Sequence, residues 1–151
     1  MKALDTNVLI RFLIEDDPQQ AAIVHQLFRD AEQSGQAMRV TSLVLLESIW
    51  VLESVYQVSR SAILDTISEL LALPVLEIEQ QPAIRRFIES ARTSSIDLSD
   101  ALIGHCARGE GCEGCEVVLT FDKEAARSDL FERLKKVPNP NKSGTPDNHP
   151  L

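Results

Sequence analysis

The sequence contains no apolar run that approaches the ~20 residues needed to span a bilayer. It also lacks the basic segment and following apolar stretch of a secretory signal peptide, because residue 5 is already an aspartate. These two absences predict a cytoplasmic protein without a membrane partner.

Positive charge is scarce. Lys and Arg number 15 against 23 Asp and Glu, which gives a formal net charge of -8. Bulk electrostatics therefore do not indicate a nucleic-acid partner. Contact with a nucleic acid would need a local basic patch, or a metal ion that reverses the sign of an acidic site.

Cysteine is also rare, and the three present lie close together. Cys106, Cys112 and Cys115 follow or adjoin His105, which gives some ingredients of a zinc site. A structural zinc site needs four ligands, with a second, distant pair, and that pair is absent. Reduced thiols in a cytoplasmic turn are the better interpretation.

Short apolar segments alternate between strand and helix patterns along most of the chain. This order predicts one α/β domain with a mostly parallel central sheet of four to five strands, flanked by helices on both faces. Strands are expected over 3–4, 37–41, 75–78 and 117–120, and helices over 8–14, 18–34, 43–55, 60–73, 82–91, 101–107 and 123–127. The expected helix starts are Asp17–Pro18, Ser42, Ser59, Pro82 and Asp100. A segment rich in Pro and Asn follows, so we expect a domain over 1–137 and a mobile tail over 138–151.

Asp5 stands between two apolar segments, at the end of the first expected strand. In open α/β sheets, ligands bind just beyond the carboxyl ends of the strands. A carboxylate between apolar runs is costly unless it is paired, and the turn itself contains no Lys or Arg, which favours a cation. The alternative is that Asp5 simply caps the next helix.

Three further acidic residues have unusual surroundings. Glu47 lies within the apolar helical segment 43–52, and large apolar residues share its face, which disfavours an ordinary solvated glutamate. Asp100 opens a helix, where it can bind a cation or complement the helix dipole. Asp122 follows the expected strand 117–120 and repeats the pattern of Asp5, so the two carboxylates would meet if their strands were neighbours.

Carboxylates that converge within about 5 Å repel by roughly 3 kcal/mol per pair at an effective dielectric constant of about 20. They must then share protons or hold a divalent cation. Oxygen ligands without His or Cys favour Mg²⁺ or Mn²⁺. Such an ion can bind a phosphodiester and lower the pKa of a bound water, so an acidic protein could cleave RNA.

The order of these motifs resembles the PIN domain, and most closely the PIN ribonucleases that act as VapC toxins of type II toxin–antitoxin pairs. The resemblance covers about residues 1–136 and depends on four short motifs: Asp5-Thr6-Asn7, Glu47 in an apolar helix, Asp100-Ala101-Leu102-Ile103 and Thr120-Phe121-Asp122.

The resemblance implies that Asp5, Glu47, Asp100 and Asp122, here called the acidic quartet, hold Mg²⁺ or Mn²⁺ for phosphodiester hydrolysis. It makes Thr6 and Thr120 supporting polar residues, with Asp97 as a further supporting residue or extra ligand. It also implies a homodimer and a cognate antitoxin that blocks the site.

Among the basic residues, Lys123 and Arg127 are the best candidates for RNA contact because they follow Asp122, and Arg11 is a weaker candidate. Trp50 and Tyr56 are interpreted as core or interface residues rather than as platforms for base stacking.

Other functions fit less well. A receiver-like magnesium-binding signalling module would need paired acids after the first strand and a Lys after the last, where Asp122 stands instead. An aspartyl-phosphate hydrolase would need Asp-x-Asp, but residue 7 is Asn. A catalytically inactive PIN domain that binds RNA or protein stays open.

Overall fold

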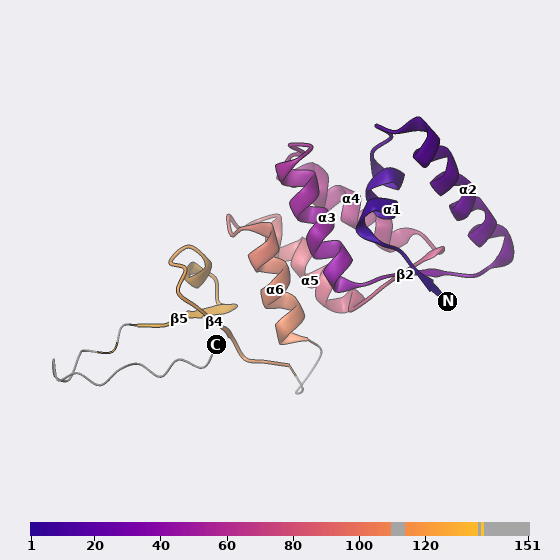
Figure 1. The fold of residues 1–151 in the computed structure, drawn as a ribbon. Coiled ribbons are helices and arrows are strands. Elements are labelled where there is room, and N and C mark those ends of the chain that lie inside the picture. The colour runs from indigo at the N-terminus through magenta and orange to yellow at the C-terminus, as the bar shows by residue number, and fades with distance from the viewer. Residues whose placement is uncertain (110–113, 136, 138–151) are drawn as a thin grey trace, which may run out of the picture.

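The structure, a computed structural model, describes residues 1–109, 114–135 and 137. Helices and strands alternate along the chain, as the sequence predicts (Figure 1). The strands are β1 (Lys2–Ala3), β2 (Met38–Val40), β3 (Leu76–Ile78), β4 (Val118–Thr120) and β5 (Phe131–Arg133). The helices are α1 (Thr6–Leu13), α2 (Pro18–Ser34), α3 (Ser42–Ser54), α4 (Arg60–Ala72), α5 (Gln81–Ala91), α6 (Leu98–Arg108) and the 3-10 helix η2 (Ala125–Arg127).

All strand pairs are parallel, which confirms the predicted α/β class. The strands nevertheless form two sheets rather than one: β1-β2-β3 and β4-β5. In the first sheet, Ala3 lies opposite Arg39, and Val40 lies opposite Ile78. Figure 1 shows β4 and β5 on the far side of α6 from β1 and β2. Each strand has only two or three residues, so each ladder contributes few hydrogen bonds to its own sheet.

Apart from α5, the α-helices of the described part begin where short polar side chains satisfy free backbone N–H groups. Asp17 and Ser59 cap α2 and α4, and Gly35 ends α2 in the left-handed region at φ 65°, as the sequence predicts. Three of these predicted starts are wrong by one to three residues, and one of them is that of α5, which begins at Gln81 instead of Pro82. Thr41, not Ser42, caps α3, and Asp97, not Asp100, caps α6.

The core lies where these helices pack against each other and against the first sheet. α6 packs on α3 and α5, and α1 packs on α2 and α3. Leu9, Ile49, Phe87 and Leu102 are among the buried side chains that fill these contacts. No helix in the described part of the chain is both long and apolar enough to cross a membrane.

Several predictions concern residues outside the described part. The predicted tail over 138–151 and Cys112 fall there. The tail and the domain boundary at residue 137 stay predictions.

Candidate active site

Asp5 lies directly after Leu4 at the end of β1 and is exposed. Its Oδ1 accepts a hydrogen bond from the backbone N–H of Asn7 at 3.0 Å, so Asp5 is the N-cap of α1. α1 therefore begins at Thr6, two residues earlier than predicted. Capping uses one carboxylate oxygen of Asp5 and leaves the other available. The geometry is therefore compatible with Asp5 as a helix cap and with Asp5 as a ligand of a cation.

Thr6 follows Asp5 in the chain and makes a hydrogen bond to Glu47. The Thr6 side chain is buried, and its Oγ1 donates a hydrogen bond to Glu47 Oε2 at 2.8 Å, which links α1 to α3. Glu47 itself is exposed, contrary to the expectation from its apolar neighbours. The reason is that the stripe it shares with Leu43 and Trp50 faces solvent, whereas Leu45, Ser48, Ile49 and Leu52 form the buried face of α3.

Asp97 and Asp100 lie together at the start of α6. Asp97 Oδ1 accepts the backbone N–H of Asp100 at 3.1 Å, so Asp97 fixes the first turn in which Asp100 lies. Burial raises the pKa of Asp100, and the negative charges of Asp97 and Asp122 raise it further. These three carboxylates are therefore electrostatic neighbours.

Asp122 lies in the turn after β4 and organises η2. Its backbone N–H donates to Thr120 Oγ1 at 3.0 Å, and its Oδ1 accepts the backbone N–H groups of Glu124 and Ala125 at 2.7 Å and 3.3 Å. Thr120 thus supports the turn that carries Asp122.

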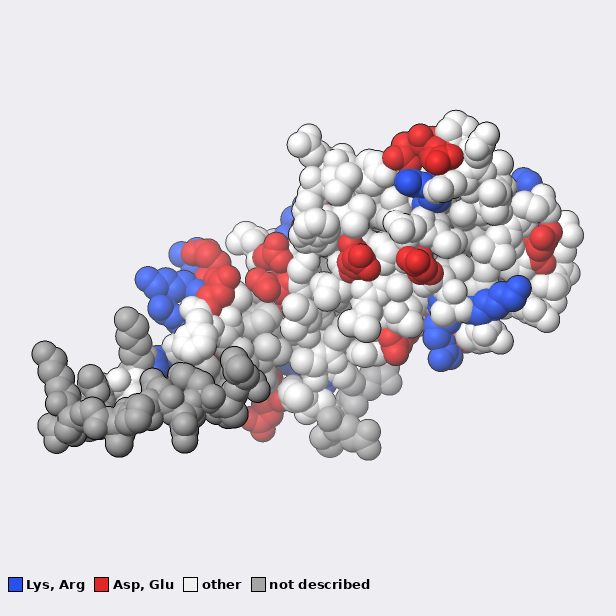
Figure 2. Space-filling model, viewed as in Figure 1, with Lys and Arg blue, Asp and Glu red and all other residues white. Residues whose placement is uncertain are grey.

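The candidate residues form two groups. The first acidic group is Asp5, Thr6 and Glu47, and the second acidic group is Asp97, Asp100 and Asp122. Figure 2 shows acidic side chains in separate patches along this face, over the start of α1, α3, α6 and the segment after β4. Among the residues that the structure describes, no three side chains of His, Cys, Asp or Glu lie close enough to share one metal ion. β1 pairs with β2, and β4 pairs with β5, so the strands before Asp5 and Asp122 are not neighbours.

The chemistry of the donors fits a hard divalent cation. The acidic quartet offers only carboxylate oxygens, which suit Mg²⁺ or Mn²⁺. Burial is the main cause of the raised pKa of Asp100, and the negative charges of Asp97 and Asp122 add to it. The carboxylate oxygens of the acidic quartet are therefore suitable ligands for such an ion. They belong to both acidic groups rather than to one.

The predicted RNA-contacting arginines are already engaged by acidic side chains. Arg11 Nη1 contacts Asp16 Oδ1 at 2.8 Å, and its Nε donates to Gln20 at 2.7 Å. Arg127 lies 3.2 Å from Glu124, and Lys123 is exposed beside Asp122.

Sequence reasoning missed two residues beside the second acidic group. Glu53 lies on α3, and burial and the charge of Asp97 raise its pKa. Arg60 donates to the carbonyl oxygens of Ala91 and Ile96, on both sides of the loop that leads to Asp97. No local pattern could have found either residue, because these contacts join segments distant in the sequence.

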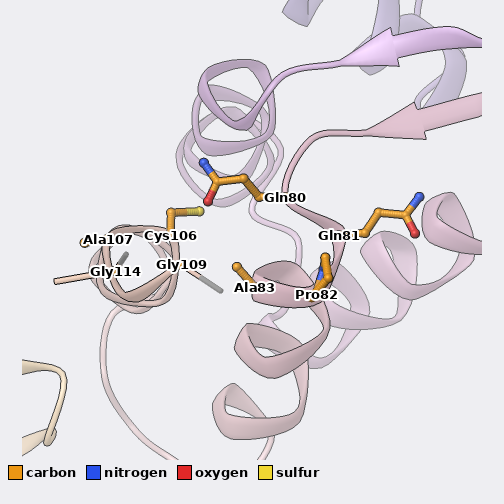
Figure 3. A pocket seen from close by; sticks show the side chains of 8 residues that line it. All are labelled: Gln80, Gln81, Pro82, Ala83, Cys106, Ala107, Gly109 and Gly114. Carbon is orange, nitrogen blue, oxygen red and sulfur yellow. The ribbon is translucent and has the colours of Figure 1, made fainter. Parts of the chain in front are cut away.

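The cysteine region lies elsewhere. Cys106 is half-buried, and Figure 3 shows its sulfur pointing toward Gln80 in a cavity of about 480 Å³ at the start of α5. Cys115 is exposed, and both are free thiols. Burial and two nearby arginines lower the pKa of His105.

Comparisons with known proteins match residues 2–130 to the PIN domain. A similar protein is the VapC ribonuclease of Aquifex aeolicus (strain VF5), which is 30% identical over 89 residues. That match covers 59% of this chain and 65% of the relative, so the chain spans slightly less than two thirds of the relative's length. No solved structure matches.

Proposed function

We propose that this chain, which belongs to the PIN domain family, is a metal-dependent endoribonuclease that hydrolyses phosphodiester bonds in RNA. The observation that carries this proposal is that the family match spans residues 2–130 and thus contains the whole acidic quartet. The similar protein named VapC ribonuclease supports RNA as the substrate class and a role as the toxin of a toxin–antitoxin pair. In that role the partners are a cognate antitoxin and a second copy of the chain.

The acidic quartet would hold Mg²⁺ or Mn²⁺. A bound ion of this kind neutralises charge on the phosphodiester and lowers the pKa of a water molecule bound to it. Because the described carboxylates lie in two groups, we infer that binding of the ion requires the first and second acidic groups to approach each other.

The residues of the chain would prepare the two groups for this task. The Thr6 hydroxyl holds Glu47 Oε2 and fixes the direction of that carboxylate from a buried position. Asp97 fixes the turn of α6 on which Asp100 lies. Burial first, and then the charges of Asp97 and Asp122, raise the pKa of Asp100, and a cation bound there would stabilise its charged form.

The test is an RNA cleavage assay with Mg²⁺ or Mn²⁺. Each of the variants Asp5→Asn, Glu47→Gln, Asp100→Asn and Asp122→Asn keeps the size of the side chain and removes one charged ligand. We expect each to lower the rate of cleavage by about 100-fold or more, since positioned groups of this kind contribute that much or more.

Glu69→Gln is the matched control, because Glu69 is an exposed carboxylate on α4, outside both acidic groups. It should cleave like the parent. A parent that binds RNA but does not cleave it with either metal would be an inactive PIN domain, and the enzymatic proposal would be wrong.

A further inference from the structure

The aromatic side chains are distributed unevenly between the interior and the surface. The chain has five Phe, one Trp and one Tyr, all within the described part. Most of them are buried or half-buried: Phe12, Phe28, Tyr56, Phe87 and Phe131. The other two, Trp50 and Phe121, are 57% and 76% exposed. The sequence predicts that Trp50 is a core or interface residue, and its exposure excludes the core.

Each exposed aromatic adjoins a residue of the acidic quartet. Trp50 lies three residues after Glu47 on α3, and side chains at this spacing are neighbours on one helix face. Phe121 directly precedes Asp122 in the turn after β4. One aromatic ring thus accompanies each of the two acidic groups.

Of the three basic residues predicted to contact RNA, Lys123 is exposed beside Asp122, and the two arginines pair with acidic side chains. Arg127 lies against Glu124, Arg11 is bound to Asp16, and the formal net charge is -8. Proteins that bind RNA mainly through its phosphates need several available Lys or Arg side chains. RNA held at this face must therefore gain much of its affinity from its bases.

We propose that Trp50 and Phe121 are stacking positions for the bases of an unpaired stretch of RNA beside the acidic quartet. The proposal rests on the proposed function and names the form of its substrate. Aromatic rings stack on bases of any sequence, and stacking contributes about 1–3 kcal/mol per base. In a duplex the base faces are covered by their neighbours, so only unpaired nucleotides can offer them.

Trp50 provides a direct measurement because it is the single tryptophan of the chain. Short single-stranded RNA is titrated into the full chain with Ca²⁺ in place of Mg²⁺, and tryptophan fluorescence is recorded together with the Kd. We expect quenching by single-stranded RNA and much weaker binding of a duplex of the same sequence. We also expect Trp50→Ala and Phe121→Ala to raise the Kd, followed by a labelled RNA, by about 5- to 150-fold each, which corresponds to 1–3 kcal/mol.

Two variants separate base stacking from a general apolar surface. Leu43→Ala is the matched control, because Leu43 is 78% exposed on the same face of α3, one turn before Glu47. It should bind RNA like the parent. Trp50→Phe keeps an aromatic ring and should retain most of the affinity, whereas Trp50→Leu keeps only apolar area and should lose it.

The proposal is wrong if RNA does not change the fluorescence of Trp50, or if Trp50→Ala does not change the Kd. It is equally wrong if duplex RNA binds as tightly as single-stranded RNA. It is also wrong if Trp50→Leu binds like the parent while Leu43→Ala does not, or if the fluorescence depends only on protein concentration. Those results would assign the face to a protein partner or a second copy. Loss of cleavage with intact quenching would instead contradict the proposed function alone.

Discussion

At the scale of single residues, capping and candidate ligation use the same side chains. Asp5, Asp97 and Asp122 each accept backbone N–H groups that begin a helix or turn. A carboxylate has two oxygens, so one can hold the backbone while the other remains available to a cation. The local fold thus fixes these side chains in place before any ligand arrives.

Asp100 allows a prediction on pH dependence. Its pKa is raised by burial and by Asp97 and Asp122, so the folded state disfavours its charged form. This cost is fully present above the pKa of the folded state and disappears as the pH falls below the ordinary value for Asp, 3.8. Without divalent metal, Asp100→Asn should therefore be as stable as the parent or more stable at neutral pH, and the difference should vanish in acid.

Urea unfolding of both proteins from about pH 3 to about pH 8 measures this difference. Asp17→Asn is the control, because Asp17 caps α2 and Asn is nearly as good a cap, so little change is expected at any pH. A variant of Asp100 that loses about 1 kcal/mol at neutral pH would show that the charge mainly complements the dipole of α6.

At the scale of elements, local chemistry made some boundaries predictable. Pro18 can occupy only the first turn of a helix, and Gly35 adopts the left-handed conformation that ends one, so both ends of α2 follow from the sequence. The start of α6 does not, because Asp97, Ser99 and Asp100 can all act as caps. Arg60, which lies far away in the sequence, donates to carbonyl groups on both sides of the loop before Asp97, and no local pattern reveals this contact.

Prediction from the sequence has the same limit for the sheet and for the candidate site. The parallel α/β class follows from the alternation of elements, and the four acidic motifs are visible as local patterns. Which strands become neighbours depends on ladders of only two or three residues, whose total energy no local pattern gives. The sequence therefore predicts the candidate residues but not their division into two groups.

At the scale of elements, we predict how replacing Arg60 changes the stability of the fold. Its guanidinium donates to Ala91 O at 3.0 Å and to Ile96 O at 2.6 Å, so it ties α4 to both sides of the loop before Asp97. Arg60→Ala leaves these partly buried carbonyls without a charged donor. We expect a loss of about 1.5–3 kcal/mol in the free energy of unfolding, and a smaller loss for Arg60→Lys, whose ammonium cannot form the same fork.

The comparison variant is Arg92→Ala, which removes an exposed ion pair of 2.8 Å with Asp65. Such surface pairs contribute about 0–1 kcal/mol, so urea unfolding should separate the two arginines clearly. Equal losses would mean that Arg60 does not organise the loop.

At the scale of the whole molecule, charge and metal are linked. An acidic chain with a formal net charge of -8 repels RNA unless cations offset its carboxylates. The same repulsion opposes the approach of the two acidic groups. A divalent ion would therefore assist both the assembly of the site and the binding of the substrate.

The last prediction follows from this linkage. If Mg²⁺ or Mn²⁺ binds the folded chain and not the unfolded chain, saturating ion must raise the thermal midpoint by mass action. At a free ion concentration of about 100 times the Kd, the gain is about 2.7 kcal/mol, which corresponds to roughly 5–10 °C for a domain of this size. Asp100→Asn lacks one charged ligand and should gain much less, whereas Glu69→Gln should gain as much as the parent. Monovalent salt at matched ionic strength controls for screening. An equal rise in all three proteins, or no rise in the parent, would show that the acidic quartet does not bind the ion.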